Sequence, residues 1–292
     1  MPSRLPCLVL AAALALAGSP AGAAPVQVAV SLLPQAFLVE RVGGDRVDTL
    51  VLVGPGDNEA TYAPSPARLA ELEAARAWFT IGVPFESAWL PRIRADRPDL
   101  AIVDLAEGLP KRRVEGGDHG HGHDGRADPH TWTDPRLAAR MALVVGDALG
   151  RLDPDHAAEY ARRAGELEQE LLALHAELAR RLAPVAGGVF IVFHPSWGYF
   201  ADAYGLEQLP IESGGHEPGP RGLATLIERG RETGARAVFV QPQFSQRSAR
   251  AVAEALDAEV IEADPLARDY IANLRSLADE LARALAPARR PE

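Results

Sequence analysis

The chain has 292 residues, 47% of them hydrophobic, and its formal net charge is -10. This length and apolar content provide a large core and are typical of two domains. Nucleic-acid backbones are bound by clustered Lys and Arg, so the acidic balance argues against a nucleic-acid partner. The basic run Lys111, Arg112 and Arg113 is short, and we interpret it as a solvated loop.

The N-terminus has the pattern of a secretory signal peptide covering residues 1–23. Arg4 supplies positive charge, an apolar stretch follows at 8–17, and Ala21-Gly22-Ala23 is a small-residue cleavage signal. No later segment reaches membrane-spanning length, so we expect a soluble mature protein. The only cysteine, Cys7, would leave with this peptide, and a metal would then be held through nitrogen and oxygen.

The mature chain alternates short β-rich segments with helical ones, which predicts an α/β fold with mainly parallel sheets. In the first half, strands are expected at 26–30, 49–53, 78–81 and 100–103, and helices at 34–42, 66–76, 85–94 and 135–149. In the second half, strands are expected at 189–193, 208–211, 237–240 and 259–261, and helices at 197–204, 221–233, 249–256 and 270–285. The two halves therefore share one architecture.

The longest helical pattern starts at Pro154, with Asp153 as its N-cap, and continues to about Leu182. About 28 residues at 1.5 Å each make a helix about 42 Å long. It is either a packed helix of one large domain or a strut that links two lobes, and we favour the strut. The prediction is two Rossmann-like lobes, with an N-terminal lobe at 24–150, a linking helix at 151–183 and a C-terminal lobe at 184–292.

A His-rich loop at 118–124 contains His119, His121 and His123, a composition typical of metal binding. It is followed by Asp128-Pro129-His130-Thr131-Trp132-Thr133-Asp134-Pro135, in which two prolines stiffen the segment that carries His130. Imidazole is a suitable ligand for zinc, copper, iron and nickel. A metal site at His130 would need further ligands from other parts of the chain.

Two further candidate ligands follow predicted strands directly. His194 follows the strand at 189–193, and Asp264 follows the strand at 259–261. In open α/β sheets, ligands bind beyond the carboxyl ends of the strands. Each of the three residues, His130 included, also lies beside a proline, and together they favour a metal site between the lobes.

Five segments, in this order and spacing, resemble one family, the metal-binding solute receptors of zinc and manganese ABC transporters. The segments are Tyr62-Ala63-Pro64-Ser65-Pro66, the eight residues from Asp128 to Pro135, Phe193-His194-Pro195-Ser196-Trp197-Gly198-Tyr199-Phe200, Gln241-Pro242-Gln243-Phe244 and Asp264-Pro265-Leu266. The resemblance covers nearly all of the mature chain. It implies two lobes joined by a long backbone helix, one metal in the cleft and, in Gram-negative bacteria, a periplasmic location.

The resemblance also implies a ligand set. His130, His194 and Asp264 match three of the four family ligands, and histidine at 194 is similar to the zinc branch, since manganese receptors place glutamate there. Zn(II) is therefore the expected ligand, with Mn(II) or Fe(II) less favoured. The fourth family ligand is a histidine, and its position is occupied here by Ala60.

Four replacements for the missing histidine are open. Glu59 is adjacent and is our first choice, because it needs the least rearrangement, although it could equally be a solvated loop carboxylate. A histidine of the His-rich loop or His216 could take its place, or the position could be left to water.

The function that we expect is a monomeric periplasmic receptor, not an enzyme, that captures zinc and delivers it to an ABC permease in the inner membrane. One alternative is a metal-dependent hydrolase, because an open position on zinc is typical of catalytic sites. Another is an extracellular metal buffer or adhesin that uses the same residues.

Overall fold

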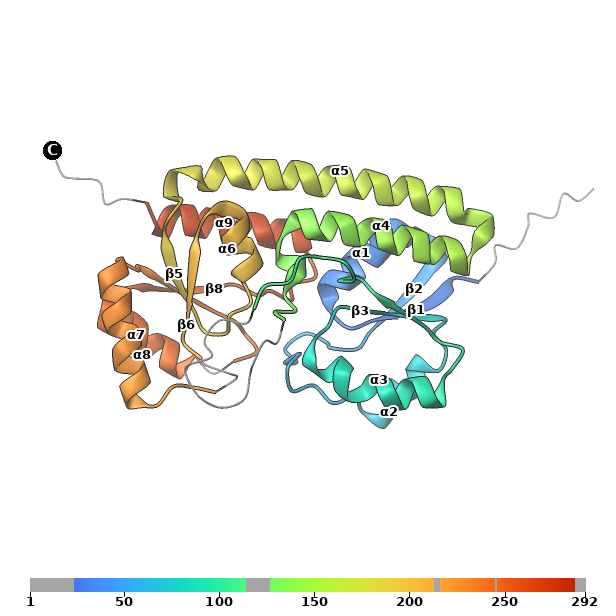
Figure 1. The fold of residues 1–292 in the computed structure, drawn as a ribbon, viewed down its shortest axis with the longest axis horizontal. Helices are drawn as coiled ribbons and strands as arrows, with labels where there is room; N and C mark the ends of the chain where they lie inside the picture. Colours follow the sequence, from blue (N-terminus) through green and yellow to red (C-terminus); the bar gives the residue numbers. More distant parts are fainter. Residues whose placement is uncertain (1–23, 114–126, 213–215, 245, 287–292) are drawn as a thin grey trace, which may run out of the picture.

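The computed structural model describes residues 24–113, 127–212, 216–244 and 246–286. They form two α/β lobes that lie side by side beneath a long helix (Figure 1). The predicted signal peptide and the His-rich loop at 118–124 lie outside the described residues. Within the described part, no helix combines the length and apolar character that crossing a membrane requires.

The first lobe is built on a four-stranded parallel sheet in the order β2-β1-β3-β4. The central strand β1 is apolar and buried except at the exposed Gln27, and its Val28 pairs with Thr49 of β2 and Ala77 of β3. The buried run at its carboxyl half needs cover on both faces, which helices provide. The strands are β1 (Val26–Val30), β2 (Val47–Val51), β3 (Ala77–Thr80) and β4 (Ala101–Asp104), and the helices are α1 (Leu33–Gly43), α2 (Pro66–Leu72), α3 (Pro84–Asp96) and α4 (Pro135–Leu152).

The second lobe repeats this plan with the strand order β6-β5-β7-β8, again with parallel pairing throughout. Its strands are β5 (Val189–Val192), β6 (Glu207–Pro210), β7 (Ala237–Val240) and β8 (Glu259–Glu262). Its helices are α6 (Gly198–Tyr204), α7 (Pro220–Thr233), α8 (Arg247–Leu256) and α9 (Tyr270–Ala284). The predicted fold class, two lobes with parallel sheets, is confirmed.

Helix α5 (Ala157–Leu182) joins the two lobes and crosses above both of them in Figure 1. It packs on α1 and α4 on one side and on α6 and α9 on the other. The residues that it buries recur every three or four positions and form one apolar stripe along the helix, namely Tyr160, Ala164, Leu167, Leu171, Leu174, Leu178 and Leu182. The strut interpretation is confirmed.

The helical segment begins at Pro154 as predicted, with a 3-10 turn at Pro154–His156 that leads directly into α5. Asp153 stands at the N-cap position, but the predicted cap is wrong, because its side chain makes no capping hydrogen bond. The carboxylate of Asp153 instead accepts a hydrogen bond from the Tyr160 hydroxyl at 2.7 Å and lies 2.7 Å from His156 Nδ1. The carboxylate of Asp153 is thus bound by these two side chains and does not accept a hydrogen bond from the backbone N–H groups at the start of the helix.

A close approach of α4 and α5 yields a first prediction. A Cβ added at Gly146 would lie 2.7 Å from the Ala164 Cβ and 3.3 Å from the Tyr160 carbonyl oxygen. Overpacking costs about 1–3 kcal/mol, and the better helix propensity of alanine offsets about 1 kcal/mol of that cost. We expect Gly146→Ala to lower the free energy of unfolding by on the order of 1 kcal/mol in urea titrations of the metal-free protein.

The same substitution at Gly165 of α5 is the matched control. A Cβ there would have no heavy atom within 4 Å, so Gly165→Ala is expected to be neutral or stabilising by up to about 1 kcal/mol. Equal effects at the two sites would contradict the close packing of the two helices.

At the carboxyl ends of β1 and β3, a buried carboxylate occupies the point where the strand order of the first lobe reverses. Glu86 is 1% exposed and accepts hydrogen bonds from the Ser31 hydroxyl and from the backbone N–H groups of Ile81 and Gly82. Burial raises the pKa of Glu86 to about 7, although these hydrogen bonds oppose the shift. Open α/β sheets commonly bind ligands at this point, but here the lobe fills it with a side chain of its own.

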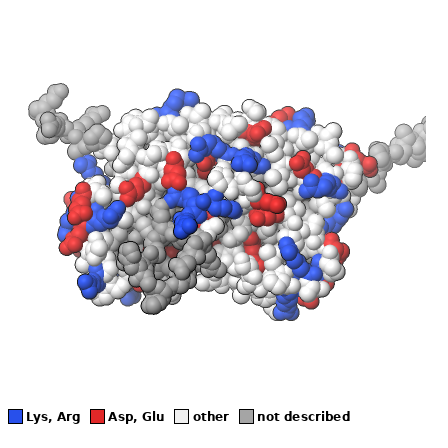
Figure 2. All heavy atoms as spheres, in the orientation of Figure 1, with Lys and Arg blue, Asp and Glu red and all other residues white. Residues whose placement is uncertain are grey.

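Charged side chains of both signs are interspersed on the face shown in Figure 2, and ion pairs join the lobes. Arg268 pairs with Glu40 of α1 at 2.6 Å. The interpretation of the basic run as a solvated loop is wrong for Arg112, whose side chain is only 15% exposed. Its guanidinium lies 3.7 Å from Asp128 of its own lobe and also pairs with Asp202 of α6, which the neighbouring lobe brings within reach.

Candidate metal centre

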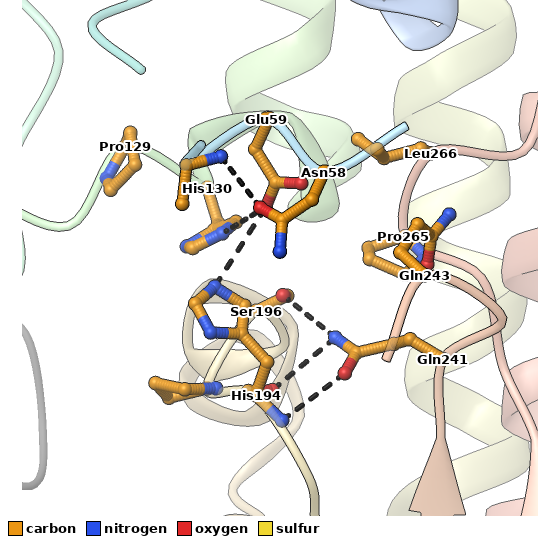
Figure 3. A network of polar contacts seen from close by, with 12 residues as sticks. Asn58, Glu59, Pro129, His130, His194, Ser196, Gln241, Gln243, Pro265 and Leu266 are labelled. Atoms are coloured by element: carbon orange, nitrogen blue, oxygen red, sulfur yellow. Dashed lines mark hydrogen bonds and ion pairs between the residues drawn. The ribbon is translucent and has the colours of Figure 1, made fainter. Parts of the chain in front are cut away.

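Three of the predicted ligands meet between the lobes. Glu59, His130 and His194 each offer one donor atom, and these atoms lie within 4.8 Å of one another. Oε1 of Glu59 is 3.5 Å from Nε2 of His130 and 3.8 Å from Nε2 of His194. Figure 3 shows both imidazoles and the carboxylate directed toward one point. This is the one such group of His, Asp, Glu or Cys side chains in the part of the chain that the structure describes.

The ring of His130 is fixed by its neighbours in sequence. Oδ1 of Asp128 accepts a hydrogen bond from the backbone N–H of His130 at 2.9 Å and lies 2.7 Å from Nδ1 of its ring. The His130 carbonyl accepts hydrogen bonds from the backbone N–H and hydroxyl of Thr133. Nε2 is buried and has no hydrogen-bond partner among the described residues, although buried polar atoms are rarely left without one.

The segment that carries His130 is also attached to the second lobe. Trp132 donates its indole N–H to the Pro265 carbonyl at 2.8 Å, and the Tyr270 hydroxyl donates to the Trp132 carbonyl at 2.6 Å. The Tyr199 hydroxyl donates to the Asp128 carbonyl at 2.9 Å. These contacts hold His130 against the lobe that supplies His194.

His194 lies two residues beyond the end of β5, at the point where the strand order of the second lobe reverses. The amide of Gln241 accepts a hydrogen bond from the His194 backbone N–H at 3.1 Å and donates to its carbonyl at 3.3 Å (Figure 3). Nδ1 of the ring lies 2.6 Å from Oε1 of Glu212, and the ring stacks on Phe244 with centroids 5.1 Å apart. Only Nε2 faces Glu59.

Glu59 is directed inward by a tight turn after β2. The Asn58 side chain accepts a hydrogen bond from the Ala60 backbone N–H at 2.8 Å, and the Asp57 carboxylate accepts one from the Gly54 backbone N–H at 3.0 Å. Glu59 is 3% exposed, whereas Ala60 is exposed. The structure thus places Glu59, our first-choice replacement for the implied histidine, beside His130 and His194. Its burial is inconsistent with the alternative of a solvated loop carboxylate.

The other candidates are placed differently. Asp264 is not one of the three grouped residues, and its Oδ1 accepts hydrogen bonds from the Gln243 amide at 2.8 Å and the Leu266 backbone N–H at 2.9 Å. His216 is exposed and lies outside the group. The histidines of the His-rich loop lie outside the described residues.

Comparison with known proteins identifies the family. The model of the family described as "Zinc-uptake complex component A periplasmic" matches residues 28–284, which is most of the chain. The chain belongs to this family.

The matches to individual members of this zinc-uptake family cover almost the whole chain. The high-affinity zinc uptake system protein ZnuA of Paracoccus denitrificans is 31% identical, and the match covers 95% of this chain and 97% of that protein. A crystal structure of ZnuA is 38% identical with a TM-score of 0.84, over 89% of this chain and 99% of that one. A zinc-bound ZnuA deletion mutant has the same TM-score at 37% identity, over 91% of this chain and 100% of that one.

The group of three side chains in this zinc-uptake family member is electrostatically coupled. Burial raises the pKa of Glu59, but the neighbouring His130 and, less strongly, His194 lower it by more, so that it lies below its ordinary value. Burial lowers the pKa of His130, but the charge of Asp128 and the carboxylate of Glu59 raise it to about 9. Near neutral pH the metal-free site therefore holds a proton on His130 that a metal ion must replace.

Two residues of the site were missed by the sequence reasoning, namely Asp128 and Glu212. Asp128 belongs to a recognised segment but was assigned no role, and its signal is an aspartate two residues before a candidate ligand with proline between them. Glu212 follows β6 and lies 18 residues from His194 in sequence, so only the sheet pairing of β5 with β6 brings it close.

Proposed function

We propose that this chain is a periplasmic receptor that binds one zinc ion between its lobes and delivers it to an ABC permease. The supporting observation is the convergence of Glu59 Oε1 with Nε2 of His130 and His194 in one buried place. Imidazole nitrogen and carboxylate oxygen are ordinary zinc ligands. The buried Nε2 of His130, which has no hydrogen-bond partner among the described residues, fits a position that faces a metal.

Zinc usually takes four ligands, so one more donor is needed. Asp264 remains our proposal for it, through Oδ2, because its Oδ1 already accepts two hydrogen bonds. Two imidazoles in the ligand set favour Zn(II) over Mn(II), which prefers oxygen ligands, and Fe(II) is less favoured on the family resemblance.

The remaining parts of the proposal rest on the family and on the sequence. The family's printed description is periplasmic, and residues 1–23 have the pattern of a signal peptide. An ABC permease of the inner membrane is the proposed partner, and a monomer is the proposed state. We also propose the domain limits given above, with lobes at 24–150 and 184–292 and a linking helix at 151–183.

Stoichiometric binding needs no chemistry on a second substrate. The named relatives are zinc-uptake components, which supports a transport role, and the hydrolase alternative receives no support from them.

A titration of metal-free protein with zinc in competition with a chelator tests the proposal. We expect one equivalent to bind, and the association constant to rise with pH. Since His130 is protonated below its pKa of about 9 and must lose that proton to bind metal, this residue alone contributes about a tenfold rise per pH unit between about pH 6 and 8. The rise is expected to level off near pH 9.

The control is a chelator whose own pH dependence is known, titrated without protein in the same buffers. Binding that is independent of pH, or a stoichiometry that differs from one, would contradict zinc capture by this site.

A further inference from the structure

We propose that Asp128 and Glu212 are positioning residues of the metal centre, one for each lobe. Each holds the proton of its histidine on Nδ1, so that the lone pair of Nε2 faces the metal. This inference rests on the proposed function, because it concerns the same site.

The geometry of the two pairs is closely similar. Asp128 Oδ1 lies 2.7 Å from His130 Nδ1, and Glu212 Oε1 lies 2.6 Å from His194 Nδ1. An ionised carboxylate only accepts hydrogen bonds, so the ring nitrogen facing it must carry the hydrogen. The opposite nitrogen of each ring is then the one free to bind a metal, and both of these nitrogens face Glu59.

The carboxylates of Asp128 and Glu212 are both buried in the protein interior. Asp128 is 3% exposed and Glu212 is 6% exposed, and placing a charged carboxylate in the interior is costly unless a partner compensates it. Asp128 has Arg112 nearby and also accepts from the His130 backbone, so it has a structural use in addition. For Glu212, the side-chain contact within the described residues is the His194 ring.

Glu212 is itself placed by the sheet. It lies two residues beyond the end of β6, and its backbone N–H donates to the Phe193 carbonyl at 3.1 Å, which continues the pairing of β6 with β5 beyond the strand ends. The carboxylate therefore lies beside His194 because of the register of the two strands. A hydrogen bond of this kind orients a ligating imidazole and raises its basicity, and its loss typically costs about 10–100-fold in metal affinity.

Glu212 gives the cleaner experiment, because its carboxylate contacts the His194 ring, whereas the carboxylate of Asp128 also lies near Arg112 and accepts from the His130 backbone. Glu212→Ala is expected to lower zinc affinity by about 10–100-fold, whereas Glu212→Gln keeps an acceptor oxygen for Nδ1–H and is expected to stay within about tenfold of the parent. Glu262→Ala, the same change at the exposed end of β8, is the matched control and is expected to bind like the parent. Affinity is measured by chelator competition, and unfolding of each metal-free variant is measured in urea.

Long-range ¹H–¹⁵N NMR of the zinc-loaded parent provides a readout that needs no variant. We expect zinc on Nε2 and hydrogen on Nδ1 for both His130 and His194. Zinc on Nδ1 of either ring would overturn the proposal, even if the alanine variant failed to fold.

Two other results would also overturn it. One is a Glu212→Ala protein that binds zinc as tightly as the parent. The other is an equal loss of affinity in the alanine and glutamine variants that follows a loss of metal-free stability, because that pattern belongs to a structural role. A parent that binds no zinc would instead refute the proposed function, so the two failures are distinguishable.

Discussion

Replacing His130 with alanine is expected to lower the affinity for zinc by about 10²–10³-fold. A zinc site with several protein ligands has an apparent binding free energy on the order of 10 kcal/mol or more, so that one ligand contributes about 3 kcal/mol, and each 1.4 kcal/mol is a factor of ten. His130 supplies one of the three grouped donor atoms. The measurement is a competition titration of metal-free protein, read at one pH.

His175→Ala is the matched control for this prediction. His175 is half-buried on α5, where it stacks on Tyr204 with ring centroids 5.3 Å apart, and it lies outside the metal-binding group. It therefore reports the cost of removing a partly buried imidazole without removing a proposed ligand. Equal zinc affinity in His130→Ala and the parent would refute the cleft site.

Thermal unfolding provides a second readout of the same substitution. A ligand that binds only the folded protein stabilises it by about 4 kcal/mol when its free concentration is 1,000 times Kd. The parent should therefore gain stability on addition of zinc, and His130→Ala should gain much less at the same concentration. The hydrogen bonds of Trp132 and Tyr270 between the lobes do not involve the side chain of His130, so this substitution leaves their donors and acceptors in place.

The fold was predictable because its main determinants are local. The buried run of β1 and the repeated alternation of strands and helices carry their own signal, and the apolar stripe of α5 has helical spacing. The predictions were wrong where a side chain contacts a group that its local sequence does not indicate. Asp153 bonds to Tyr160 in place of a helix N-terminus, and Arg112 reaches carboxylates that only the folded lobes bring close.

The grouping of three candidate ligands was predictable only in part from local patterns. His130 and His194 stand beside prolines at the ends of predicted elements, and the structure brings both together with Glu59. Asp264 follows its strand as expected but is not part of the group of three. The partner of His194 could not be found from sequence, because Glu212 depends on the register of β6 against β5.

Glu59→Gln is expected to lower zinc affinity by about 10²-fold, because a neutral amide is a far weaker zinc ligand than a carboxylate of the same shape. Glu59 stands next to Ala60, where the family resemblance implies a histidine, and its Oε1 faces both imidazoles. The chelator competition assay is applied to this variant, to His216→Ala and to a variant lacking residues 118–124. The last two are expected to bind within about threefold of the parent.

Comparing the zinc affinities of these three variants shows which residue takes the place of the histidine that the family resemblance implies. A large loss in the variant lacking 118–124, with Glu59→Gln unchanged, would assign the ligand to the His-rich loop and would contradict the role of Glu59. The pH dependence gives a second readout of the same substitution. Since the Glu59 carboxylate raises the pKa of His130, its removal should lower that pKa from about 9 and move the plateau of the association constant to lower pH. Because Glu59→Gln competes less with protons near neutral pH, its loss of zinc affinity is expected to be larger on the plateau than at pH 7.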